Sequence, residues 1–152
     1  MTEVWFYHLT MQPLERVLPV LLEKTVQRGW RGVVQTGAEE RLAALDDLLW
    51  TYSDESFLAH GTARDGDSEM TPVYLTAGSE NPNGAQARFL VHGADTSALT
   101  PDGEYERVLI LFDGNDDDQL QAARANWKRL KEAGFGVSYW QQGETGGWDK
   151  KA

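Results

Sequence analysis

Apolar residues recur along the chain in short segments whose spacing alternates between the period of a strand and that of a helix. Segments rich in β-branched and aromatic residues predict strands over residues 3–9, 32–36, 72–76, 87–92, 107–112 and 135–141. Apolar residues at helical spacing predict helices over residues 14–28, 38–50 and 116–133. Pro19 either kinks the first helix or is a first-turn residue of a helix that begins near Leu18. Residues 51–71 predict an irregular connection.

The order of these elements indicates the fold class. Strands and helices alternate through the first fifty residues, which favours a largely parallel sheet with helices on both faces. The strands at 72–76 and 87–92 are separated too briefly for a helix, which favours antiparallel pairing between them. We therefore expect an α/β fold, a single three-layer α/β/α domain with a mostly parallel, mixed sheet. It spans residues 1–141, and a polar C-terminal tail follows over 142–152.

Composition narrows the possible classes of protein. The chain has 152 residues, of which 41% are hydrophobic and 25% charged, which is typical of one globular domain. The absence of cysteine excludes disulfides, thiolate zinc sites and cysteine nucleophiles. The first ten residues, MTEVWFYHLT, have no basic region leading into an apolar run, and no apolar stretch approaches the ~20 residues that cross a bilayer. We expect a cytoplasmic protein with no membrane contact.

The charge balance bears on nucleic-acid binding. With 24 acidic and 14 basic residues, the formal net charge is −10. Neutralising phosphates needs a surplus of Lys and Arg, and single strands are held in basic grooves with stacking aromatics. A direct single-stranded-DNA binder is therefore disfavoured, and we expect any contact with DNA to be indirect, through another protein.

Motifs for chemistry are missing from the sequence. The turn after the first strand, residues 8–13, contains no glycine, so it is neither a P-loop nor a dinucleotide-binding turn. There is no G-x-S-x-G nucleophile motif. The alternative function, a small nucleotide-binding α/β enzyme, therefore has little support. We predict no catalytic residues, no cofactor and no enzymatic activity.

Metal binding has equally little support. His8, His60 and His92 lie far apart and lack the close spacing of zinc ligands. The acidic run Asp113–Asp118 lacks the glycine and the final glutamate of a calcium loop. It is better explained as the acidic first turn of the helix that follows. We expect no metal site.

The 116–133 helix has the pattern of a docking surface. At about 100° per residue, one apolar stripe results; it consists of Leu120, Ala123, Trp127 and Leu130. Arg124, Lys128 and Lys131 fall on the strip beside it. An aromatic bordered by cations suits a peptide with an apolar anchor and carboxylates. The alternative is that Trp127 faces the core and the cations stabilise the C-terminal end of the helix through its dipole.

A second aromatic group follows the 38–50 helix. The segment WTYSDESFLAH, residues 50–60, brings Trp50, Tyr52 and Phe57 close together in sequence. Aromatics at this density in a loop either close the edge of the core or form a hydrophobic interface.

Five segments, in order, resemble the chi subunit family of bacterial DNA polymerase III. They are WFYHL, LLEKTVQRGWRGVV, RLAALDDLLWTYSDESFLAHG, VLILFDG and ARANWKRLKEAGFGVSYW. The strongest signatures are LDDLLW followed by ESFLAHG, and the R-x-x-aromatic-K element that ends in AGF. The resemblance implies an α/β subunit without activity of its own, an adaptor between the clamp-loader and single-stranded-DNA-binding protein.

The resemblance also implies two partner surfaces. Arg124, Trp127 and Lys128 would receive the acidic, Phe-terminated C-terminal tail of single-stranded-DNA-binding protein. Trp50 and Phe57 would dock the psi subunit or the clamp-loader, or an XPD-like repair helicase that competes for the same surface. Some family members have Tyr in place of Trp127, and the Pro that usually precedes the His is Ala59 here.

Overall fold

The computed structural model describes residues 2–52, 58–144 and 147–152. Its α-helices are α1 (Leu14–Gln27), α2 (Leu42–Thr51) and α3 (Asp117–Glu132). Its strands are β1 (Glu3–Leu9), β2 (Gly32–Thr36), β3 (His60–Thr62), β4 (Val73–Thr76), β5 (Ala87–Val91), β6 (Arg107–Asp113), β7 (Gly136–Gln142) and β8 (Trp148–Lys150). Short 3₁₀ helices cover Glu39–Arg41, Ala63–Asp65 and Ser68–Met70. Every predicted strand and helix is present, with ends that differ by a few residues at most.

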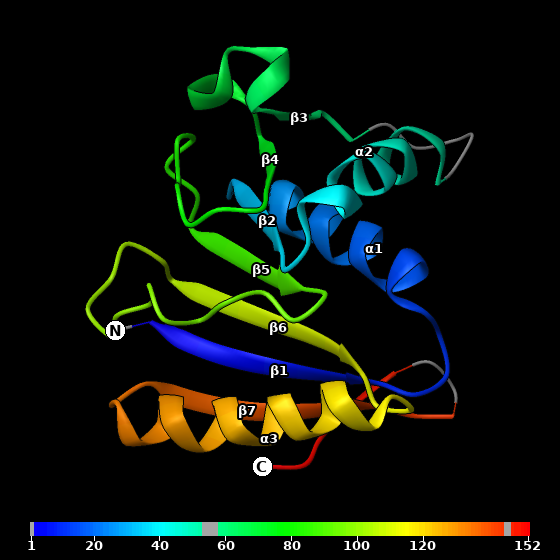
Figure 1. Cartoon of the computed structure of the whole chain (residues 1–152), viewed down its shortest axis with the longest axis vertical. Helices are drawn as coiled ribbons and strands as arrows, with labels where there is room; N and C mark the ends of the chain where they lie inside the picture. Colours follow the sequence, from blue (N-terminus) through cyan, green and yellow to red (C-terminus); the bar gives the residue numbers. More distant parts are fainter. Residues whose placement is uncertain (1, 53–57, 145–146) are drawn as a thin grey trace.

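One mixed sheet runs through the molecule in the order β3-β4-β2-β5-β6-β1-β7-β8, from one end of the chain's long axis to the other (Figure 1). Six neighbouring pairs are parallel, and β7 with β8 is antiparallel. The expected antiparallel pairing of β4 with β5 is wrong. Both strands pair parallel with β2, one on each side.

The physical reason is the reach of the 77–86 connection. Crossing two strand spacings and returning along one strand takes roughly 26 Å, and ten extended residues span about 33 Å. The chain therefore passes over β2 and begins β5 at the same end as β4, without needing a helix. The 77–86 connection is therefore long enough for a parallel crossover, although its lack of a helix had favoured a hairpin.

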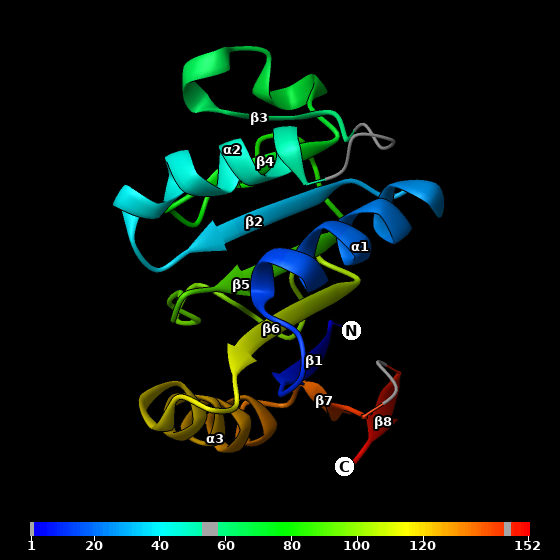
Figure 2. The same cartoon turned by 90° about the vertical axis from the view of Figure 1, so that its right-hand side faces the viewer.

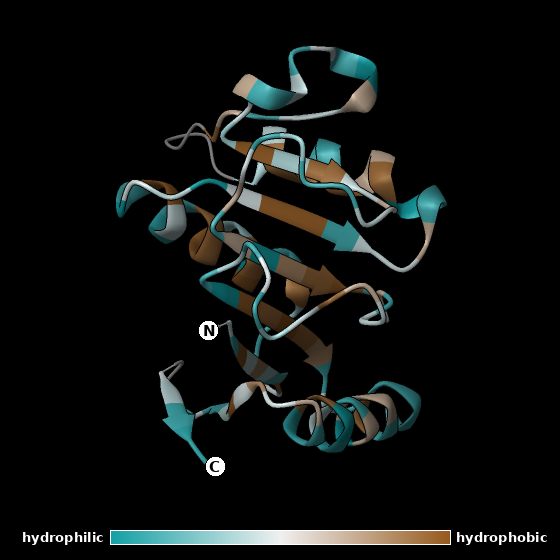
Figure 3. Cartoon of the chain, turned by 90° about the vertical axis from the view of Figure 1, so that its left-hand side faces the viewer, coloured by the Kyte–Doolittle hydropathy of each residue, from teal (hydrophilic) through white to brown (hydrophobic). Residues whose placement is uncertain are grey.

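Helices cover both faces of the sheet, which confirms the three-layer prediction. Helices α1 and α2 lie side by side over the β2 half, and α3 lies at the other end, near β1 and β7 (Figure 2). Leu18, Leu22 and Leu49 from α1 and α2 belong to one buried cluster. Ala123 and Leu130 of α3 belong to another, on the opposite face. The strands between these layers are coloured as hydrophobic over much of their length in Figure 3.

The α3 face of β2, β4 and β5 is covered by the 77–86 loop instead of a helix. Arg88 of β5 is 1% exposed and supplies the polar partners that this loop needs. Its guanidinium donates to the carbonyls of Gly78 and Glu80, at 2.6 and 2.9 Å, and also to the Gln35 amide oxygen and the Tyr105 hydroxyl. A buried arginine thus satisfies backbone carbonyls that a loop, unlike a helix, leaves unpaired.

Two local outcomes resolve points that the sequence left open. Helix α1 begins at Leu14 and continues through Pro19, which is buried inside the helix. In the expected polar tail, Trp148–Lys150 forms strand β8 against β7. The Trp148 ring packs edge-on against Tyr7, with 4.6 Å between ring centroids. The tail therefore contributes an edge strand and one aromatic to the fold.

Candidate functional site

Helix α3 begins with a strong local signal in the sequence. The Asp116 carboxylate accepts hydrogen bonds from the backbone N–H groups of Asp118 and Gln119, at 3.0 and 3.2 Å, which is an N-cap. Asp117 and Asp118 lie in the first turn, and Arg129 and Lys131 lie in the last turn. The charges at both ends therefore interact favourably with the helix dipole. These features fix the helix on the sheet and hence the direction of its side chains.

Trp127 lies at the boundary between the core and the surface. Its ring is partly buried and meets the rings of Phe6 and Tyr139 edge-on, with centroids 5.5 and 5.9 Å apart. Leu130 and Ala123, from the same predicted stripe, are fully buried. Trp127 therefore packs against core aromatics while keeping part of its ring at the surface, so its position combines the two alternatives.

His8 and Tyr139, which the sequence did not assign to this surface, complete the aromatic cluster. The Tyr139 hydroxyl is hydrogen-bonded to His8 Nδ1 at 2.6 Å, and the His8 ring lies 5.1 Å from the Phe112 ring, centroid to centroid. His8, like Phe6, points to the α3 face because alternate residues of β1 share a face. The alternation along β1, together with Tyr139 on the adjacent strand β7, is the sequence signal that could have identified both residues.

Arg124 influences both polar members of the cluster. Burial lowers the pKa of His8 below its ordinary 6.5, and the Arg124 charge lowers it further, while Asp113 acts in the opposite direction. Burial raises the pKa of Tyr139, and Arg124 partly offsets that rise. The lowered pKa favours the neutral form of His8, so the cations of this surface are those of α3.

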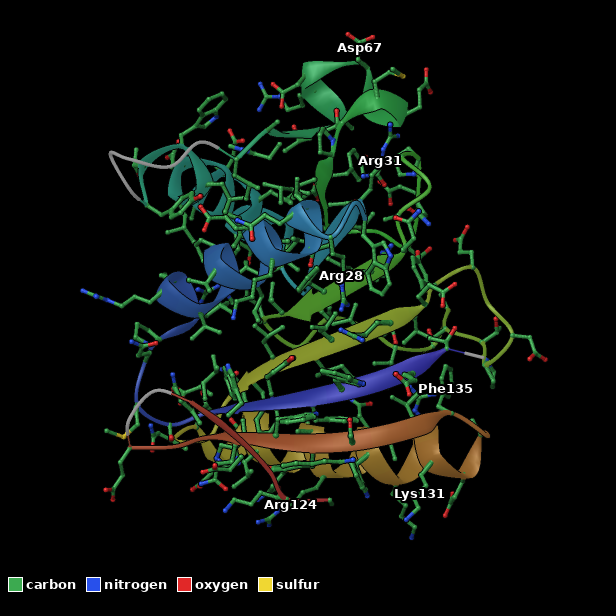
Figure 4. The ribbon with its side chains drawn as sticks, turned by 180° about the vertical axis from the view of Figure 1, so that it is seen from behind. Arg28, Arg31, Asp67, Arg124, Lys131 and Phe135 are labelled. Atoms are coloured by element: carbon green, nitrogen blue, oxygen red, sulfur yellow. The ribbon has the colours of Figure 1, made fainter. Side chains whose placement is uncertain are left out.

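Cations surround the exposed side of Trp127. Arg124 and Lys128 are exposed and four residues apart, so they lie on the same strip of the helix. Lys131 Nζ lies 6.0 Å from the centre of the Trp127 ring, within range of a cation–π interaction. Arg124 and Lys131 extend from α3 at the outer side of the fold (Figure 4). We call Arg124, Trp127, Lys128, Lys131 and Tyr139 the α3 surface.

Gly114 shapes the loop that leads into α3. A Cβ atom added at this position would overlap the imidazole ring of His8. Only glycine therefore lets the β6–α3 loop pass close to the cluster. The Gly114 backbone N–H also donates to the Leu9 carbonyl at 2.8 Å, which ties this loop to the end of β1.

The second predicted surface is partly visible. Trp50 lies near the end of α2 and is 55% exposed, an unusually high value for a large aromatic. Its ring is 4.8 Å from that of His60, and His60 Nε2 lies 3.0 Å from the Asp46 carboxylate. Phe57, the other predicted residue, lies outside the described residues. Trp50 and Arg124 are on elements at opposite ends of the sheet (Figure 1).

The three histidines occupy separate places. His8 bonds to Tyr139, His60 lies beside Asp46, and His92 Nδ1 is 2.9 Å from the Thr36 hydroxyl. Among the residues that the structure describes, no three His, Asp or Glu side chains gather as metal ligands would. No helix in the same part of the chain is long and apolar enough to cross a bilayer.

An aromatic cluster edged by cations, on a helix that packs against an α/β sheet, defines a candidate protein-docking surface. The chain belongs to the DNA polymerase III chi subunit family, HolC, whose model matches residues 1–138. It is 26% identical over 117 residues to "Probable DNA polymerase III subunit chi" of Rickettsia prowazekii (strain Madrid E), covering 74% of this chain and 71% of that protein. The family resemblance seen in the sequence is thereby confirmed. Membership makes the chain an accessory subunit of the DNA polymerase III complex.

Proposed function

We propose that this chain is an adaptor of the DNA polymerase III holoenzyme, which binds the acidic C-terminal tail of single-stranded-DNA-binding protein. The tail would occupy the α3 surface through Arg124, Trp127 and Lys128. The observation that carries the proposal is a partly exposed indole with Lys131 beside it, on a helix that also exposes Arg124 and Lys128, in a protein of net charge −10.

The chemistry of the α3 surface suits such a tail. A terminal Phe side chain would pack against the exposed part of Trp127, next to an aromatic cluster that already favours edge-on contacts. The terminal carboxylate and the acidic residues before it would be oriented by Arg124 and Lys128, through charge-assisted hydrogen bonds.

The same proposal gives Trp50 a role at the second surface. An exposed indole on α2, at the far end of the sheet from α3, would dock the psi subunit or the clamp-loader. An XPD-like repair helicase would compete for it. The family's Pro is Ala59 in this chain, so the backbone that presents this surface has one fewer conformational restraint.

Two separate docking surfaces make a tether. One attaches the chain to the replicase, and the other holds tails displayed on coated single-stranded DNA. Many weak contacts with tails on one coated strand would raise the effective concentration of the polymerase there. The protein would act in the bacterial cytoplasm, where the chromosome is replicated, and its acidic character would keep it from competing for the DNA itself.

Titration of a labelled acidic peptide ending in Pro-Phe tests the α3 surface. We expect saturable binding to the wild type that weakens with added salt, because the contacts are between charges at the surface. The Arg124→Ala and Lys128→Ala variants should each bind roughly two- to twelvefold more weakly, because a hydrogen bond at an exposed site contributes about 0.5–1.5 kcal/mol net. Fluorescence anisotropy at low and high salt measures both effects.

Two controls separate the site from general effects of charge. Arg16→Ala removes an exposed cation from α1 and should leave the peptide affinity unchanged. A peptide without its final Phe should bind weakly to every variant. A folded Arg124→Ala/Lys128→Ala double variant with wild-type affinity would show that the tail does not bind on α3.

A further inference from the structure

A second aromatic and cationic site lies on the opposite face of the sheet from α3. It is a pocket of about 570 Å³ between the C-terminal half of α1 and strands β1 and β6. Its aromatic lining consists of Trp5, Tyr7, Trp30 and Trp148. The volume falls within the ~300–1,000 Å³ typical of ligand sites. Because Trp5 and Phe6 are neighbours on β1, their side chains point to opposite faces, so this pocket is separate from the α3 surface.

Cations and indoles alternate in the pocket. The Arg107 guanidinium lies 3.8 Å from the centre of the Trp5 ring and 5.5 Å from that of Trp30. Arg28 lies 4.6 Å from Trp30, and the other face of this group is extended by Trp140, which stacks on Trp5 at 5.2 Å. These stacked indole and guanidinium groups present flat faces for stacking, and the edges of the guanidinium groups carry N–H donors.

The side chains that line the pocket carry positive charge. Lys24, Arg28 and Arg107 belong to the lining, which contains no Asp or Glu among its described residues. Arg107 Nε is buried without a hydrogen-bond partner in the described part of the chain, although such groups are normally satisfied. Burial lowers the pKa of Arg107, and the neighbouring Arg28 charge lowers it further, against opposite effects of Tyr7 and Glu3. An anion bound between Arg28 and Arg107 would relieve their repulsion.

We propose that this pocket binds a nucleoside phosphate, either as a free nucleotide or as one unit of single-stranded nucleic acid. The base stacks on the layers formed by Trp30 and Arg107, and the phosphate is held between Arg28 and Arg107, with Lys24 as the third cation of the lining. Stacking on indoles and guanidinium planes accepts any base, because every base has a π-face. A nucleotide also joins a flat ring to an anion through one sugar, which matches cations placed directly beside indoles.

The net charge of −10 limits the number of phosphates that this site can bind. Three lining cations suffice for one or two phosphates, but the field of the whole protein opposes a long phosphate backbone. With two phosphates contacted on a single strand, log affinity should fall with log salt at a slope of about −1.4. That slope amounts to a loss of roughly sevenfold between about 50 and about 200 mM salt. The proposal stands apart from tail binding, which uses the other face.

Calorimetric titration of the full chain with thymidine monophosphate, thymidine, inorganic phosphate and an eight-residue oligothymidylate tests the pocket. We expect thymidine monophosphate to bind, and both thymidine and phosphate to bind at least about tenfold more weakly, since each lacks half of the contacts. An oligonucleotide that binds more tightly than the monophosphate identifies single-stranded nucleic acid as the source. Equal affinities identify the free nucleotide.

Matched charge-reversal variants test whether the nucleotide binds in this pocket. Arg28→Glu reverses an exposed charge in the pocket and should weaken monophosphate binding at least about tenfold. Arg16→Glu makes the same change on the same helix outside the lining, and should leave it unchanged. Unchanged affinity in a folded Arg28→Glu variant would overturn the proposal, as would the absence of binding at low salt. Competition by the acidic Phe-terminated peptide for this pocket would also overturn it, by making the ligand a peptide.

Discussion

Replacing Arg88 tests whether a buried arginine holds the loop layer of this fold together. Arg88→Met keeps the length of the side chain but removes every donor of the guanidinium. The Gln35 amide oxygen and the carbonyls of Gly78 and Glu80 would lose a partner. Each buried acceptor left unpaired costs about 1–3 kcal/mol. Taking the low end, because the 77–86 loop can shift toward water, the loss of stability is about 3 kcal/mol.

A loss of this size is measurable by denaturation. For a chain of this length each kcal/mol lowers Tm by roughly 2–4 °C, so Arg88→Met should melt about 6–12 °C below the wild type. Urea denaturation should give the same free-energy difference at 25 °C. The control is Arg16→Met, because Arg16 is exposed on α1.

The Gln35→Met change provides the sharper test of the reasoning. Gln35 accepts two of the Arg88 hydrogen bonds, at 3.0 and 2.7 Å. Removing both partners should therefore cost less than the sum of the single changes, by about 0.5–3 kcal/mol. An Arg88→Met variant whose Tm falls by less than about 2 °C, or strict additivity in the double variant, would refute the role assigned to this network.

Three further predictions concern the α3 surface and its supports. Gly114→Ala should weaken tail-peptide binding, measured by anisotropy, because its Cβ displaces the His8 ring; unchanged affinity would separate His8 from the site. Asp116→Ala should cost about 1 kcal/mol in urea denaturation through loss of the helix cap, and Asp117→Ala less, because Asp117 acts only on the dipole. The pKa values of His8 and His92 are lowered, chiefly by burial, so the unfolded chain binds protons first and stability should fall as pH drops below about 6.5. A His8→Gln variant should show a smaller fall between about pH 7.5 and 5.5, and an unchanged fall would contradict the lowered pKa of His8.

The sequence predicted most of the fold because its local signals agree with one another. Asp116 caps α3, the apolar stripe of α3 faces the core, and β6 is apolar from Val108 to Phe112 because both its faces are covered. The pairing of the strands was harder to predict from the sequence. The 77–86 connection is short enough for a hairpin and long enough for a parallel crossover, and only the position of β2 between β4 and β5 decides.

The two candidate sites differ in how far the sequence revealed them. The α3 surface lies largely on one helix, so a 3.6-residue period placed Arg124, Trp127 and Lys128 together. The pocket on the other face is built from Trp5, Trp30, Arg107 and Trp148, which stand far apart in the chain. The proximity of Trp5, Arg107 and Trp148 depends on the β6-β1-β7-β8 strand order, which no local pattern encodes. The net charge indicated an acidic protein and gave no sign of the cationic pocket.

Strand β1 explains how a single small domain can hold both sites. Its alternate residues serve opposite faces: Phe6 and His8 support the α3 surface, whereas Trp5 and Tyr7 line the pocket. The strand is paired on both sides, to β6 and β7, so it is rigid where both sites need support. A ligand on one face therefore meets the other site only through the backbone of a central strand. We expect tail peptide and nucleotide to bind without affecting each other, and calorimetric titration of either ligand into protein saturated with the other measures this. A change in affinity of more than about threefold, with both ligands still bound at saturation, would show that β1 couples the two faces.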